Sequence, residues 1–215
     1  MSKTAVLFDF DGTLFFGTTE INYYAINMAL GDMGRPPISM EIANTTVGDK
    51  IPDACRRILE SDDPELVQTL FDGIFRYAPK AIAEHAHMEP DCVHMLRTLS
   101  QRVPLAICSN AEESYLTSLL SAFGVQDCFS YIWHATPGYD KTRAIPEIMR
   151  IIDVERAVMV GDREEDVRSG RANGCVTVAM QNDLGARDAI GADYDVYNHR
   201  EMEETLLSIL EKMEM

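Results

Sequence analysis

The fold of this chain is decided by residues 5–14, Ala5-Val6-Leu7-Phe8-Asp9-Phe10-Asp11-Gly12-Thr13-Leu14. The apolar run predicts a buried strand, and two acids spaced two residues apart at its carboxyl end share one face. In an open α/β sheet, ligands bind at the carboxyl ends of the strands. Two carboxylates that address one point repel each other unless a cation or a shared proton relieves them. Because carboxylate oxygens suit a hard cation, the stretch predicts a Mg²⁺ site.

Short apolar segments recur along the chain and alternate with helical patterns. The expected strands are residues 4–10, 103–108, 130–134, 157–160, 176–179 and 194–196. The helices expected between and after them are residues 91–101, 113–123, 143–152, 165–173 and 201–213. Strands that alternate with helices indicate a doubly wound, mostly parallel sheet of the α/β class.

Residues 16–85 break this alternation, because they contain only helical patterns. Helices are expected at residues 20–30, 40–45, 51–59 and 64–84. A segment of this length far exceeds what a crossover between two parallel strands needs. We therefore expect a helical insertion over residues 16–85, with residues 1–15 and 86–215 forming the α/β core.

The composition argues against several classes of protein. A formal net charge of −16 disfavours nucleic-acid binding, which needs a basic face. No apolar run reaches the roughly 18 residues that a membrane span requires. The cysteines are odd in number, five in all, and lack a C-x-x-C pair, which suits reduced thiols better than a disulfide framework. Since the N-terminus also lacks the shape of a signal peptide, we expect a cytoplasmic protein.

Three further motifs follow the first one in order. An apolar segment ends in Ser109-Asn110, Lys141 precedes an expected helix, and Gly161-Asp162 is followed by Asp166. Together with the stretch from Asp9 to Thr13, this series resembles the motifs of the haloacid dehalogenase-like hydrolase superfamily. The resemblance covers nearly the whole chain. It implies that family's Rossmann-like core with a helical cap of the C1 type in residues 16–85, as in phosphoglycolate phosphatase-like members.

The resemblance also implies a role for each motif residue. Asp9 would attack phosphorus as the nucleophile, and Asp11 would serve as general acid and base. The expected catalytic residues are Asp9, Asp11, Ser109 and Lys141. The expected Mg²⁺ ligands are Asp9, Asp11, Asp162 and Asp166. The expected substrate-binding residues are Gly12, Thr13, Asn110 and Lys50, the last of which stands in the insertion and is equally compatible with an exposed lysine.

The sequence thus favours Mg²⁺-dependent hydrolysis of a small phosphorylated metabolite through an aspartyl-phosphate. Two alternatives stay open. A sugar-phosphate mutase of the β-phosphoglucomutase type would use the same pair of acids and return the phosphoryl group to bound substrate. A non-catalytic protein that binds a phospholigand on the same fold would ordinarily have lost Asp9 or Asp11. The sequence fixes neither the substrate nor the choice between a monomer and a homodimer.

Overall fold

A parallel sheet with the strand order β3-β2-β1-β4-β5-β6 forms the centre of the molecule. The computed structural model describes residues 3–181 and 191–214. The strands are β1 (Thr4–Phe8), β2 (Leu105–Cys108), β3 (Tyr131–Trp133), β4 (Arg156–Gly161), β5 (Val176–Met180) and β6 (Tyr194–Val196). From β1 the chain builds the sheet outward through β2 and β3, and it then returns to β4 on the other side of β1. This order confirms the doubly wound α/β class.

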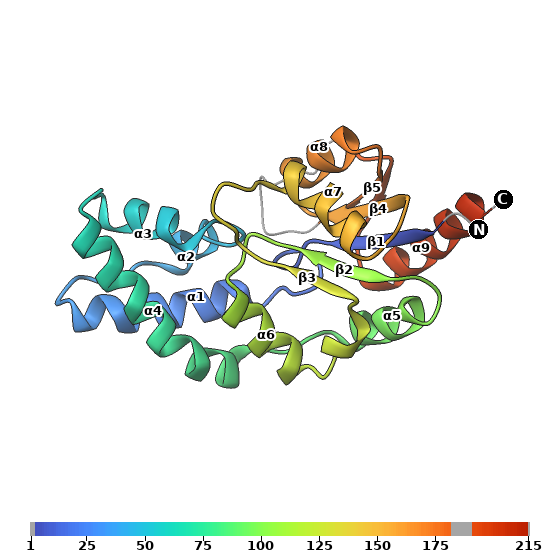
Figure 1. The fold of residues 1–215 in the computed structure, drawn as a ribbon. Coiled ribbons are helices and arrows are strands. Elements are labelled where there is room, and N and C mark those ends of the chain that lie inside the picture. The colour runs from blue at the N-terminus through green and yellow to red at the C-terminus, as the bar shows by residue number, and fades with distance from the viewer. Residues whose placement is uncertain (1–2, 182–190, 215) are drawn as a thin grey trace.

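Helices cover both faces of the sheet (Figure 1). The core helices are α5 (Pro90–Ser100), α6 (Glu113–Ala122), α7 (Lys141–Ile151), α8 (Glu164–Ala172) and α9 (His199–Glu214), with a 3₁₀ turn, η1, at Gln126–Cys128. One apolar cluster joins the sheet to α5, α6 and α9 through residues that include Val6, Phe8, Leu96, Leu116 and Leu206. A second cluster on the opposite face joins it to α7 through Ala5, Leu7, Ile145 and Ile148.

Strand β1 is buried along its whole length. Successive side chains of a strand point to opposite faces, and both faces of this sheet carry helices, so β1 has no polar face to show to water. This burial explains why residues 5–8 form a continuous apolar run instead of an alternating one. The first charged residue after this run, Asp9, is also the first residue beyond the strand.

Four helices lie between β1 and α5, at one end of the molecule, in the segment for which the sequence predicts a helical insertion (Figure 1). They are α1 (Thr18–Asp32), α2 (Met40–Asn44), α3 (Ile51–Leu59) and α4 (Pro64–His85). Side-chain caps start two of them: the Ser39 hydroxyl accepts a hydrogen bond from the Ile42 N–H, and the Asp63 carboxylate accepts one from the Glu65 N–H. α1 and α4 approach closely at Gly73, where an added Cβ would come within 2.7 Å of the Ala29 Cβ.

The element boundaries differ slightly from those expected from the sequence. β1 ends at Phe8 instead of residue 10, because the chain turns immediately afterwards: the N–H groups of Leu14 and Phe15 both donate to the Phe10 carbonyl. α7 begins at Lys141, two residues earlier than expected, because the Asp140 carboxylate caps it by accepting from the Arg143 N–H. Lys141 therefore belongs to the first turn of a helix.

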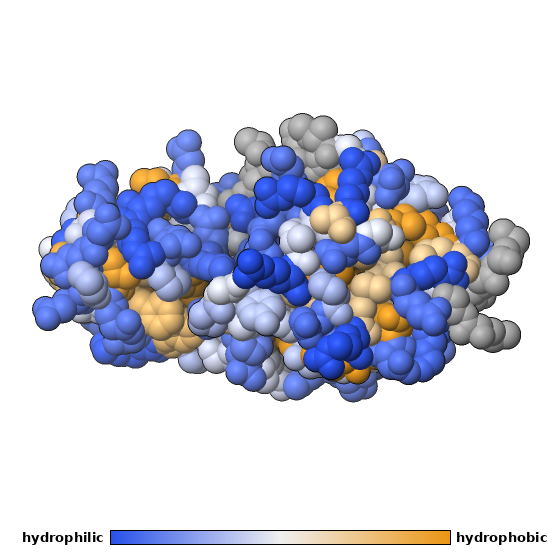
Figure 2. All heavy atoms as spheres, turned by 45° about the horizontal axis from the view of Figure 1, so that its top comes forward, coloured by the Kyte–Doolittle hydropathy of each residue, from blue (hydrophilic) through white to orange (hydrophobic). Residues whose placement is uncertain are grey.

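The visible surface is predominantly hydrophilic, as the space-filling view shows (Figure 2). None of the helices in residues 3–181 and 191–214 is both long enough and apolar enough to cross a membrane.

The close approach of α1 and α4 predicts opposite effects for two glycine substitutions. Gly73→Ala should lower the free energy of unfolding by about 1–2 kcal/mol, because the clash with Ala29 outweighs the better helix propensity of alanine. Gly31→Ala is the matched control, since an added Cβ there meets no atom within 4 Å; it should raise the free energy of unfolding by up to about 1 kcal/mol. Urea unfolding measures both. A shift of the same sign in the two variants would contradict this packing.

Candidate active site

The expected site residues converge at the carboxyl end of the sheet. Asp9 and Asp11 follow β1, Ser109 follows β2 and Asp162 follows β4, while Lys141 begins α7. β1 and β4 are the neighbours between which the direction of winding reverses. A reversal of this kind opens a crevice at the strand ends, because the connections leave in opposite directions. The fold therefore brings together in space motifs that lie more than 100 residues apart in sequence.

Three buried carboxylates form a cluster at this point. One oxygen from each of Asp9, Asp162 and Asp166 lies within 4.8 Å of the other two, and these residues are only 3%, 2% and 1% exposed. Two glycines make room for them: a Cβ on Gly12 would collide with the Asp162 carboxylate, and one on Gly161 would collide with that of Asp166. Gly12 also has a φ of 84°, a conformation that favours glycine. The cluster offers only oxygen donors, as a hard cation requires.

Lys141 is buried within the same cluster. Its Nζ donates to Oδ1 of Asp9 at 2.7 Å and to Oδ1 of Asp166 at 2.5 Å. Burial alone would lower the pKa of Lys141, but the carboxylates of Asp166 and Asp9 outweigh it and hold that pKa well above its usual range. The ammonium group therefore stays charged beside Asp9. Burial raises the pKa of Asp166 to about 6, although the positive charge of Lys141 opposes this shift.

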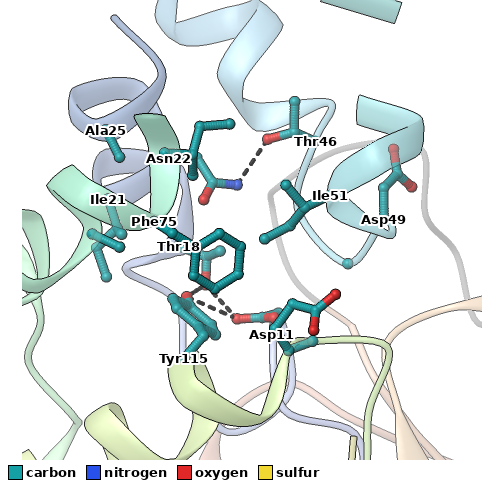
Figure 3. A pocket seen from close by; sticks show the side chains of 15 residues that line it. Asp11, Thr18, Ile21, Asn22, Ala25, Thr46, Asp49, Ile51, Phe75 and Tyr115 are labelled. Carbon is teal, nitrogen blue, oxygen red and sulfur yellow. Dashed lines mark hydrogen bonds between the residues drawn. The ribbon is translucent and has the colours of Figure 1, made fainter. Parts of the chain in front are cut away.

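Asp11 lies in a different environment from Asp9. The Thr18 hydroxyl donates to Asp11 Oδ1 at 2.6 Å, and the Tyr115 hydroxyl lies 3.3 Å from the same oxygen and 3.2 Å from Thr18 Oγ1 (Figure 3). Burial raises the pKa of Asp11 to about 7, although the hydrogen bond from Thr18 opposes the shift. Two neighbouring carboxylates thus have distinct partners, and only Asp9 contacts the lysine.

The remaining expected residues of the core lie in the segments that follow β1 and β2. Ser109 is buried, and its Oγ accepts from the Ala111 N–H at 3.1 Å. The Asn110 amide donates to Glu165 at 3.2 Å, so it is attached to the start of α8. The carbonyl of Thr13, a fully buried residue, accepts from His199 Nε2 at 2.9 Å. Hydrogen bonds to distant parts of the core thus hold the turn after β1 and the residues after β2.

The loop before α3 approaches the core from the insertion. Nη1 of Arg163, the residue after Asp162, donates to the Gly48 carbonyl at 2.7 Å, and its Nη2 lies 3.2 Å from Asp49 Oδ1. Arg57 donates to the other oxygen of Asp49 at 2.8 Å. Lys50 directly precedes α3. A pocket lies beside Asp11, and its lining includes Asp49 and Ile51, the two neighbours of Lys50, but not Lys50 itself.

The sequence did not indicate a role for Thr18, Tyr115 or Arg163. A threonine at the start of a helix and a tyrosine within one carry no signal of their own. Tyr115 stands 104 residues from Asp11, and only the packing of α6 beside α1 brings the two together. Arg163 does stand inside the fourth motif, so its position next to Asp162 was the one available indication of a role.

This chain is similar to proteins of a known family. A family model described as haloacid dehalogenase-like hydrolase matches residues 6–180. The chain belongs to this family. A phosphoglycolate phosphatase from Chromobacterium violaceum is 30% identical over 213 residues, which cover 92% of this chain and 94% of the relative. A phosphoglycolate phosphatase from Neisseria meningitidis serogroup A is 29% identical over 201 residues, or 88% of this chain and 85% of the relative.

Solved structures show the same fold. A predicted phosphatase from Clostridium acetobutylicum superposes with a TM-score of 0.80 at 20% identity, over 97% of this chain and 100% of that one. The family match and the curated relatives together confirm the resemblance of the motifs. This chain is a phosphoric monoester hydrolase.

The raised pKa of Asp11 predicts how its replacement changes stability with pH. The folded state keeps a proton on Asp11 up to about pH 7, whereas the unfolded chain loses it near pH 3.8. Stability therefore falls as the pH rises through this window. Asp11→Asn is neutral at every pH, so without metal its stability relative to the parent chain should rise between pH 4 and pH 8, by on the order of 1–3 kcal/mol.

Thermal unfolding in metal-free buffers at pH 4, 6 and 8 measures this difference. Asp62→Asn is the matched control, because the Asp62 side chain is 95% exposed and its replacement should give no such trend. A difference between Asp11→Asn and the parent chain that is constant with pH would contradict the protonation of Asp11.

Proposed function

We propose that this phosphatase is Mg²⁺-dependent and hydrolyses a small phosphate monoester through a covalent phosphoryl group on Asp9. The observation that supports this proposal most directly is the pair of neighbouring carboxylates with different partners. Asp9 contacts the charged Lys141, whereas one oxygen of the Asp11 carboxyl group contacts two hydroxyl groups and its pKa is about 7. A nucleophile has to be ionised and a general acid has to hold a proton, so the two environments match the two roles.

The chain's own residues can carry both halves of the reaction. The Asp9 carboxylate attacks phosphorus while Asp11 gives its proton to the leaving oxygen, and the alcohol departs. In the second half, Asp11 takes a proton from water as the water oxygen attacks the aspartyl-phosphate, which restores both carboxyl groups and releases phosphate. Lys141 offsets negative charge at Asp9 throughout. Ser109 and Asn110 would hold the phosphoryl oxygens.

The carboxylate cluster fits a magnesium ion, because its donors are all oxygen and a single lysine offsets three closely spaced acids. We propose Asp9, Asp162 and Asp166 as ligands. The assignment of Asp11 as a fourth ligand stays a prediction, since its Oδ1 is engaged by Thr18 and Tyr115. When bound, Mg²⁺ neutralises charge on the carboxylates and on the phosphate and orients the phosphate.

The names of the curated relatives make phosphoglycolate the first substrate to test. The mutase alternative uses the same pair of acids and differs only in the acceptor, so incubation with a hexose phosphate separates the two: a mutase yields an isomer and a phosphatase yields free phosphate. We also propose a cytoplasmic location, because all five cysteines are buried free thiols, which suits a reducing compartment.

Replacement of the nucleophile tests the covalent mechanism. Asp9→Asn keeps the shape of the side chain and removes its charge, so phosphate release should fall by about 10³-fold or more. The fold should persist, and without metal the melting temperature should hold or rise, because the change relieves repulsion in the carboxylate cluster. Phosphate release and circular dichroism measure the two effects. Comparable activity in a folded Asp9→Asn protein would refute the mechanism.

Metal removal tests the magnesium site. EDTA should abolish phosphate release and excess Mg²⁺ should restore it. Ca²⁺ should restore little activity, because it prefers more ligands at longer distances than this compact cluster offers. Asp162→Asn should raise the Mg²⁺ concentration that gives half-maximal activity. Full activity after exhaustive chelation would argue against metal at these residues.

We further propose that residues 16–85 move as a cap that opens to admit substrate and closes to exclude water. The side chain of Arg163 contacts Gly48 and Asp49, and so joins this loop to the core beside Asp162. A role for Lys50 in substrate binding requires such a motion, because in the arrangement seen here Lys50 lies outside the pocket.

Loss of the Arg163 contact should loosen the cap. Arg163→Gln should lower kcat/KM for the physiological ester by on the order of tenfold and affect p-nitrophenyl phosphate less, because cap contacts mainly orient the substrate. Hydrogen exchange at residues 45–50 should rise in Arg163→Gln. It should not rise in Arg168→Gln, which changes an exposed arginine of the same helix. Unchanged exchange in both variants would show that Arg163 does not hold the loop.

A further inference from the structure

A pocket opens beside Asp11, between the helical insertion and the start of α6 (Figure 3). Side chains of α1, α4 and α6 and of the loop before α3 surround it. Asp11 lies at its inner end, together with Thr18 and Tyr115. If Asp11 protonates the leaving oxygen, as the proposed function requires, the rest of the departing alcohol has to lie in this pocket. The side chains that line this pocket therefore indicate which kind of alcohol the substrate contains.

The walls of the pocket are mainly apolar. The apolar residues that line it are Ile21, Ala25, Ile51, Ile74, Phe75, Ala78 and Ala111. Asn22 and Thr46 provide uncharged polar groups, and the Asn22 amide donates to the Thr46 hydroxyl at 2.8 Å. The carboxyl groups among the described lining are those of Asp11, Asp49 and Glu112, and none of that lining is lysine, arginine or histidine.

The two arginines that contact lining residues, Arg163 and Arg57, are already engaged. Arg163 donates to the Gly48 carbonyl and contacts one oxygen of Asp49, and Arg57 donates to the other oxygen. A carboxylate on the departing group would lose hydration in this pocket and would lie near the carboxylate of Glu112, with no cationic side chain in the described lining. An anion that is buried without a cation is strongly disfavoured.

The pocket is also small. Its free space is about 50 Å³, enough for a few water molecules or an organic group of a few heavy atoms. The apolar walls favour a group that presents carbon to them.

From this pocket we infer the class of substrate: a phosphate monoester of a small, uncharged alcohol with an apolar part, and not an ester whose alcohol carries a carboxylate. In the reaction the P–O bond breaks, the alcohol leaves with the Asp11 proton, and water supplies the new oxygen on phosphate and reprotonates Asp11. The inference rests on the proposed function, and it differs from the substrate in the names of the curated relatives.

A pair of nearly isosteric esters tests the charge preference. Phosphoglycolate carries a carboxylate where phosphoglycolamide carries a neutral amide. With Mg²⁺ present, kcat/KM for phosphoglycolamide and for propyl phosphate should exceed that for phosphoglycolate by about tenfold or more. A preference for phosphoglycolate in the parent chain would overturn the inference. If that activity is lost in Asp9→Asn, the proposed function would still stand.

A matched pair of lysine variants tests the pocket itself. Asn22→Lys places a cation in the lining, and it should shift the ratio of the two kcat/KM values toward phosphoglycolate by about tenfold. Tyr23→Lys adds the same charge at the next position of α1, an exposed residue outside the lining, and should leave the ratio unchanged. Thermal unfolding verifies that both variants fold.

The remaining outcomes distinguish failure of the inferred substrate class from failure of the proposed phosphatase function. An unchanged ratio in a folded Asn22→Lys protein would show that the departing group lies elsewhere, and would overturn the inference. If Asn22→Lys does not fold, the ratio in the parent chain decides alone. Release of no phosphate from any ester, p-nitrophenyl phosphate included, would refute the proposed function and this inference with it.

Discussion

The buried ammonium group of Lys141 is the interaction on which the site depends. Asp9, Asp162 and Asp166 each place a carboxylate oxygen within 4.8 Å of the other two, with almost no exposure to water. Carboxylates at such distances repel strongly in a medium of low dielectric constant. Lys141 contacts Asp9 and Asp166 at once, and so offsets part of this repulsion before any metal or phosphate binds. The cost of burying the lysine is compensated in turn, because both carboxylates stabilise its charged form.

This arrangement also separates the properties of two acids that are only two residues apart. Asp9 contacts a cation, whereas Asp11 is buried and contacts hydroxyl groups from α1 and α6. Burial without a cation favours the protonated form of a carboxyl group, which raises its pKa. The site thus creates a difference in protonation between chemically identical side chains. A strand and a turn alone could not do so, because the difference comes from elements that pack against them.

The insertion completes the environment of Asp11 and forms most of the pocket beside it. Thr18 begins α1, and the apolar residues of α1 and α4 face Asp11 across the pocket. Arg163 joins the loop before α3 to the residue that follows Asp162. The chemistry at the sheet and the shape of the pocket therefore come from different parts of the chain. With this division, a change in the helices that line the pocket can alter the choice of substrate without altering the residues at the strand ends.

The sequence by itself determined the sheet, the run of helices that follows β1 and the acidic residues at the strand ends. Runs such as residues 5–8 are long and apolar enough to indicate buried strands, and the order of the motifs identified the family. It did not reveal that Thr18 and Tyr115 hold Asp11, that Arg163 contacts Gly48, or that Lys50 stays outside the pocket. These facts depend on how helices far apart in the chain pack together. Periodicity reports which face of an element is buried, but not which side chain it meets there. Only the tertiary structure decided those contacts, and with them the chemistry of the pocket.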